Sequence, residues 1–118
     1  MASFIEYGMI NLRKSRIASA ELNKQTYDIC LITEPYTPGG NVALLDKSAG
    51  DLYYALGKAP RACIRAKSKD VWMVNEFTDR DICVIAAKIR GTLTYIASVY
   101  LDINLNAKSP IMVNLIER

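Results

Sequence analysis

Glu34 occupies a position in the sequence that is suited to binding a metal ion. Glu34 follows the apolar run of residues 29–32 and precedes Pro35, so it comes at the end of a buried strand, where the chain turns. In open α/β sheets ligands bind at the carboxyl ends of the strands, and carboxylate oxygens are ligands that Mg²⁺ prefers. Glu34 is therefore either a Mg²⁺ ligand or a solvated acid at a strand end.

Two more polar side chains come at predicted strand ends. Asn11 ends the first strand, and its amide can orient a carboxylate or a metal-bound water; asparagine is also a common turn former. Tyr100 ends the last clear strand, where a phenol can donate to a phosphate oxygen or pack half-buried. Asn11, Glu34 and Tyr100 form the candidate site.

The first elements explain how Asn11 and Glu34 come together. Residues 4–12 read as a strand, residues 15–25 as a helix with Ser15 as its N-cap, and residues 27–33 as a strand buried on both faces. This order predicts a βαβ unit. Because its helical crossover is short, we expect the two strand ends to lie side by side.

The rest of the chain is predicted to be mostly strands. A long loop follows Glu34 to about residue 56, and residues 61–66 and 71–74 are expected to form a hairpin. Residues 82–89 and 92–101 form a second hairpin around Arg90-Gly91, and the later strand alternates between two distinct faces. We expect Tyr53 and Tyr54 to pack, and a helix to begin at Ser109-Pro110.

Composition limits the possible function. With 118 residues and 51% hydrophobic content, the chain is long enough for one modest core. The net charge of +3 is compatible with a nucleic-acid partner but does not establish one. Three cysteines in apolar surroundings suggest reduced thiols and an intracellular protein, nuclear or cytoplasmic, and no apolar run is long enough to cross a membrane. The absence of histidine excludes any mechanism in which this chain supplies an imidazole.

Basic residues gather in two places. Arg13, Lys14 and Arg16 follow Asn11 directly and are the candidate nucleic-acid-binding residues. A second group surrounds the first predicted hairpin and comprises Lys58, Arg61, Arg65, Lys67 and Lys69. Each group either follows a phosphate backbone or is ordinary solvated surface charge.

The motifs, in their order, resemble the endonuclease domain of insect-type non-LTR retrotransposons, of the endonuclease/exonuclease/phosphatase superfamily. They are Ile10-Asn11-Leu12-Arg13-Lys14-Ser15, Ile32-Thr33-Glu34-Pro35-Tyr36, Arg61-Ala62, Phe77-Thr78-Asp79-Arg80-Asp81 and Ser98-Val99-Tyr100-Leu101. The resemblance implies a Mg²⁺-dependent phosphodiesterase that nicks target DNA. It also implies that Asn11 positions the metal site, Glu34 binds Mg²⁺ and Tyr100 contacts the scissile phosphate.

The departures from that family define the expected fold and activity. Thr33 stands where the family usually has Gln, and the Gly-Asp-x-Asn strand and the terminal Ser-Asp-His are absent. We therefore expect residues 1–118 to be a single partial α/β domain, one half of a two-sheet sandwich truncated before its second half. Without the missing C-terminal half, the chain is expected to be inactive. The alternatives are a non-catalytic module that binds nucleic acid or protein, and a fragment with no selected role.

Overall fold

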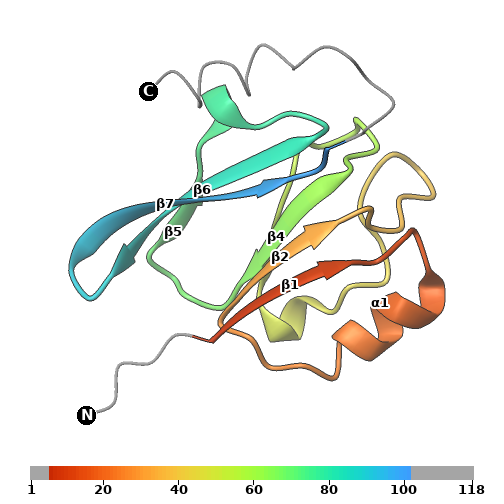
Figure 1. Cartoon of the computed structure of the whole chain (residues 1–118), viewed down its shortest axis with the longest axis horizontal. Coiled ribbons are helices and arrows are strands. Elements are labelled where there is room, and N and C mark those ends of the chain that lie inside the picture. Colours follow the sequence, from red (N-terminus) through yellow and green to blue (C-terminus); the bar gives the residue numbers. More distant parts are fainter. Residues whose placement is uncertain (1–5, 102–118) are drawn as a thin grey trace.

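The computed structural model describes residues 6–101 and shows two β-sheets packed face to face, with one short helix outside them (Figure 1). Sheet A has the strand order β1-β2-β4-β3, and sheet B has the order β5-β6-β7. The elements are β1 (Tyr7–Asn11), α1 (Arg16–Leu22), β2 (Ile29–Thr33), β3 (Asp51–Tyr53), β4 (Ala62–Ala66), β5 (Val71–Met73), β6 (Ile82–Ile89) and β7 (Thr92–Val99), with single 3-10 turns η1 (Lys47–Ala49) and η2 (Asn75–Phe77). Strands thus dominate a fold with few helices.

The predicted βαβ unit is confirmed. Strands β1 and β2 are parallel neighbours, and Asn11 lies opposite Thr33 in their register. Helix α1 begins after Ser15, whose Oγ accepts a hydrogen bond from the backbone N–H of Ala18 at 3.0 Å. The first residues of the predicted strand, 4 and 5, lie outside the described residues. This unit sets the ends of β1 and β2 at the same edge of sheet A.

The hairpin of β6 and β7 is also confirmed. Ile89 pairs with Thr92, so Arg90 and Gly91 form a two-residue turn with φ values of 52° and 77°. Two successive positive φ values are what a type I′ hairpin turn requires, and glycine adopts such a value without strain. The alternation predicted for the second strand is present as well, because Ser98 is buried while its neighbours on either side are exposed.

The first predicted hairpin is wrong. Strand β4 lies in sheet A between β2 and β3, whereas β5 lies in sheet B and pairs with β6. All five residues of β4 are buried, since one face of this strand meets sheet B and the other lies toward α1. The exposed residues 67–70 therefore carry the chain from one sheet to the other and form no turn within a sheet.

The long loop after Glu34 is more ordered than the sequence suggests. It contains η1 and the short strand β3, which pairs with β4. Tyr53 and Tyr54 pack against the core, as expected. The helix predicted from Ser109-Pro110 lies outside the described residues.

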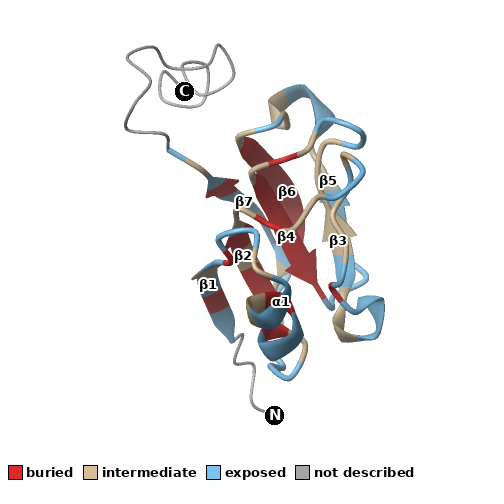
Figure 2. Cartoon of the chain, turned by 90° about the vertical axis from the view of Figure 1, so that its right-hand side faces the viewer, coloured by how far each residue is buried: buried red, intermediate tan, exposed pale blue. Residues whose placement is uncertain are grey.

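Sheet A has a hydrophobic core on each of its faces, and strands β4 and β6 are buried along most of their length (Figure 2). Leu12, Leu22 and Ile32 belong to the core on the α1 side, whereas Ile29, Ile64 and Ile85 belong to the core between the sheets. The three cysteines are buried free thiols, as expected. Burial raises the pKa of Cys83 to about 12 and that of Cys63 well above its usual value. The thiols are therefore neutral core residues.

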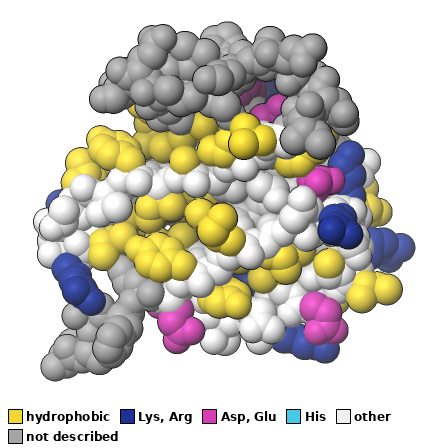
Figure 3. All heavy atoms as spheres, in the orientation of Figure 1, with side chains coloured by type: hydrophobic (Ala, Val, Ile, Leu, Met, Phe, Trp, Pro, Cys, Tyr) yellow, Lys and Arg dark blue, Asp and Glu magenta, His cyan; other side chains and the backbone are white. Residues whose placement is uncertain are grey.

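Within residues 6–101, large apolar side chains are exposed along β1 and β7. The large side chains exposed there are Tyr7, Met9, Leu93, Tyr95 and Val99, which we call the open apolar edge. Figure 3 shows hydrophobic side chains gathered on this face of the molecule. Strand β1 pairs only with β2 and β7 only with β6 among the described strands, so each has one free edge.

Candidate active site at the ends of β1, β2 and β7

The backbone of Glu34 is held on both sides in an unusual conformation. Its N–H donates to the carbonyl of Arg61 at 2.9 Å, and its carbonyl accepts from the N–H of Lys14 at 2.8 Å. Its φ is 49°, in the left-handed region that residues with a Cβ adopt at a cost of about 1 kcal/mol or more. The two hydrogen bonds stabilise this conformation at the residue that directly follows β2.

Asn11 contacts the Glu34 carboxylate directly. Its Nδ2 donates to Glu34 Oε1 at 3.0 Å, and its Oδ1 accepts from the N–H of Arg13 at 2.8 Å. Because a backbone N–H can only donate, Oδ1 must face Arg13, and the amide must present its N–H group to the carboxylate. The structure thus brings Asn11 and Glu34 together, as the βαβ unit predicts.

The Glu34 carboxylate fits the role of one ligand to a hard cation. Oε1 accepts the hydrogen bond of Asn11, while Oε2 accepts none from residues 6–101, and the side chain is only half-buried. Mg²⁺ is usually held by one or two carboxylates, with water and substrate phosphate completing its six ligands. No group of three or more cysteine or acidic residues that could hold a metal occurs within residues 6–101.

Tyr100 lies one residue past β7 and packs against an ion pair. Its N–H donates to the carbonyl of Asp81 at 2.9 Å, and the Arg61 guanidinium lies 4.7 Å from the centre of its ring. Arg61 in turn donates to both carboxylate oxygens of Asp81, from Nε and Nη2, at 2.7 Å each. The sequence pointed to Tyr100, but Arg61 was noted only as a member of a basic group and of the Arg61-Ala62 motif, with no role at the site. A lone Arg-Ala pair carries no signal for its partner, which comes 20 residues later.

A buried serine joins the two strand ends. Ser98 is 2% exposed, and its Oγ donates to the carbonyl of Ile32 at 2.9 Å, which links β7 of sheet B to β2 of sheet A. Ser98 and Ile32 each stand two residues before a candidate site residue, Tyr100 and Glu34 respectively. This bond therefore fixes the position of one strand end relative to the other.

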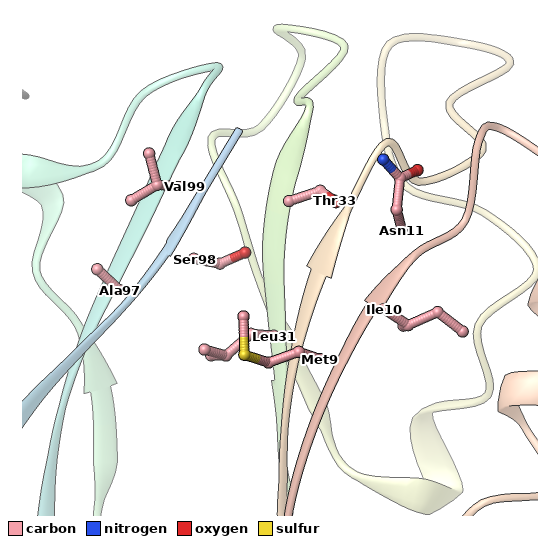
Figure 4. A pocket seen from close by; sticks show the side chains of 8 residues that line it. All are labelled: Met9, Ile10, Asn11, Leu31, Thr33, Ala97, Ser98 and Val99. Atoms are coloured by element: carbon pink, nitrogen blue, oxygen red, sulfur yellow. The ribbon is translucent and has the colours of Figure 1, made fainter. Parts of the chain in front are cut away.

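A cavity of about 310 Å³ opens beside these strand ends. Figure 4 shows Asn11 and Thr33 at its upper part, Ala97, Ser98 and Val99 on the β7 side, and Met9 and Leu31 close together at its base. The cavity thus runs from the candidate site to the open apolar edge.

The two basic groups differ in the structure. Arg13, Lys14 and Arg16 are exposed, and none forms a salt bridge with a described residue. The second group does not form one surface. Lys58 pairs with Asp79 at 2.9 Å, and Arg65 is 1% exposed and belongs to the core. Lys58, Lys67 and Lys69 are exposed as well, but only the first group follows Asn11 directly in the sequence.

Comparison with known proteins gives an informative similarity among solved structures. No protein-family model matches the chain, and no curated protein does. Among solved structures, the endonuclease domain of TRAS1, a telomere-specific non-LTR retrotransposon, has a TM-score of 0.67 and 22% sequence identity. The chain shares the fold of that endonuclease domain. The match covers 97% of this chain and 50% of the other, so the chain spans about half the length of the structure that it resembles.

The described residues contain no candidate membrane-spanning helix. Helix α1 has seven residues, and no helix within residues 6–101 is both long and apolar enough to span a membrane.

Proposed function

We propose that the chain is the N-terminal half of a Mg²⁺-dependent endonuclease domain of a non-LTR retrotransposon, which nicks target DNA by phosphodiester hydrolysis. The observation that carries this proposal is the hydrogen bond of Asn11 to Glu34 at the end of two parallel strands. It leaves one carboxylate oxygen open beside exposed basic residues, in a fold shared with a retrotransposon endonuclease.

Each residue of the site has a role in this proposal. Glu34 would supply one oxygen ligand to Mg²⁺, and Asn11 would hold that carboxylate in a single orientation. Tyr100 would donate its phenolic hydrogen to an oxygen of the scissile phosphate, while Arg13, Lys14 and Arg16 would contact the flanking backbone. Bound Mg²⁺ stabilises negative charge on the phosphate and lowers the pKa of water.

A second polypeptide half is the partner that this proposal requires. The open apolar edge leaves Met9 81% exposed and Tyr95 63% exposed, in a fold whose solved counterpart is about twice as long. Large apolar patches of this kind mark interaction sites. We propose that the second half covers this edge and supplies a base and further acidic groups, since the chain contains no histidine and residues 6–101 hold no group of three or more acidic or cysteine residues.

Binding without cleavage is the second candidate function. The exposure of Arg13, Lys14 and Arg16 beside the site favours it, because these residues can contact a phosphate backbone without any metal. A module of this kind would bind DNA with an affinity that does not depend on Glu34.

Nicking of supercoiled plasmid tests the proposal. We expect the 118-residue chain alone to produce no Mg²⁺-dependent nicking above that of its Glu34→Ala variant. When it is joined to the C-terminal half of a related endonuclease, nicking should appear and should require Mg²⁺. A joined domain that is folded and binds DNA but never nicks it would favour the binding module.

A further inference from the structure

We propose that Arg61 is a positioning residue that fixes the Tyr100 ring relative to Glu34. The inference rests on the proposed function, in which these two residues act on the same phosphate. Arg61 is in contact with both: its carbonyl accepts the N–H of Glu34 at 2.9 Å, and its guanidinium lies 4.7 Å from the centre of the Tyr100 ring. One residue, directly before β4, thus connects the ends of β2 and β7.

Tyr100 needs such support because the β-ladder ends before it. The last paired residue of β7 is Val99, opposite Ile82. Beyond it, the Tyr100 backbone is held by the carbonyl of Asp81, and its ring is contacted by Arg61. The face of an aromatic ring attracts a cation, so the guanidinium restricts where the ring can lie.

The Arg61 side chain is itself held in one orientation. Its two hydrogen bonds to Asp81 are short and parallel, and the Arg61 and Asp81 side chains are only 16% and 25% exposed. A planar guanidinium can form this paired contact and stack on a ring at the same time, whereas a lysine ammonium lacks the fork and the flat face. Asp81 therefore contacts Tyr100 through its carbonyl and supports the ring indirectly through Arg61.

Tyrosine-ring NMR on the full 118-residue chain tests the geometry without any cleavage reaction. With ring-labelled tyrosine, the Tyr100 signals are those lost in Tyr100→Phe. We expect Arg61→Lys and Asp81→Asn to move or broaden the Tyr100 ring signals and to leave those of Tyr27, which packs against the core on the α1 side, in place. Tyr100 signals unchanged in both variants would overturn the proposal, as would equal changes at Tyr27.

A coupling measurement separates positioning from a merely structural role. In the joined domain, Arg61→Lys should slow single-turnover nicking by roughly tenfold, because small displacements of a substrate-contacting group are costly. In a Tyr100→Ala background, the same change should cost less than about twofold, since coupled residues are not additive. Equal losses in both backgrounds would show that Arg61 does not act through Tyr100. A joined domain that never nicks would refute the proposed function, while the ring signals would still decide the position of Tyr100.

Discussion

Replacing Glu34 by glutamine should reduce single-turnover nicking by the joined domain by more than about a hundredfold. Glutamine keeps the volume of the side chain and can still accept the hydrogen bond that Asn11 donates at 3.0 Å. It loses the negative charge that a cation requires. Loss of one preorganised electrostatic group costs on the order of 3 kcal/mol in the transition state, and each 1.36 kcal/mol is tenfold in rate.

Matched substitutions give the controls for Glu34→Gln. Glu21→Gln and Glu76→Gln remove the same charge from exposed positions on α1 and η2 and should leave the rate within about twofold of the parent. Asn11→Ala and Tyr100→Phe should have smaller effects than Glu34→Gln, because each removes a hydrogen bond and no anionic ligand. If Glu34→Gln nicks as fast as the parent at every Mg²⁺ concentration, Glu34 is an ordinary strand-end acid.

Replacing Arg65 by alanine should lower the free energy of unfolding by about 3 kcal/mol, a cost typical of removing a large buried side chain. Arg65 is 1% exposed, and its guanidinium donates to the Leu22 carbonyl and to Asn23 Oδ1 at 3.2 Å each. The same Asn23 oxygen accepts the N–H of Asp46, so Arg65 joins sheet A to the end of α1 and to the loop before η1. A cation at a helix C-terminus is also favourable.

The loss of unfolding free energy in Arg65→Ala should come more from lost packing than from the lost charge. Arg65 Nε has no hydrogen-bond partner among the described residues, and both bonds of the guanidinium are long, so the charge is only partly compensated. Arg65→Met keeps most of the stem and should cost only about 1 kcal/mol. Arg16→Ala, at an exposed position, should stay within about 0.5 kcal/mol. Urea unfolding of the three variants measures these differences, and a stable Arg65→Ala would contradict the packing explanation.

Local periodicity predicted the parts of the fold that local contacts determine. The β1-α1-β2 unit and the β6–β7 hairpin follow from helical spacing, from a capping serine and from Arg90-Gly91, all within short stretches of sequence. The pairing of β4 with β2 joins residues that are far apart in the sequence. Because β4 is buried on both faces, its apolar run is compatible with either sheet, and the sequence alone wrongly favoured a hairpin with β5.

In the candidate site, too, the local contacts were predictable from the sequence and the long-range contacts were not. The proximity of Asn11 and Glu34 follows from a parallel strand pair with a short crossover, and the structure has it. The support of Tyr100 by Arg61 and Asp81 does not follow from the sequence, because it depends on how β4 and β6 meet across the two sheets. The hydrogen bond from Ser98 to Ile32 could not be predicted from the sequence either, because it joins the two sheets and its residues are 66 positions apart.

Binding of a paramagnetic divalent cation to the full chain tests the central claim most directly. Mn²⁺ takes oxygen ligands as Mg²⁺ does, and it broadens NMR signals of nearby nuclei. We expect Mn²⁺ to broaden the amide signals of Asn11 and Glu34 first, to leave that of Asp51 in β3 sharp, and to lose its effect in Glu34→Gln. Broadening at Asn11 that persists unchanged in Glu34→Gln, or no broadening there in the parent, would contradict a metal site at Glu34.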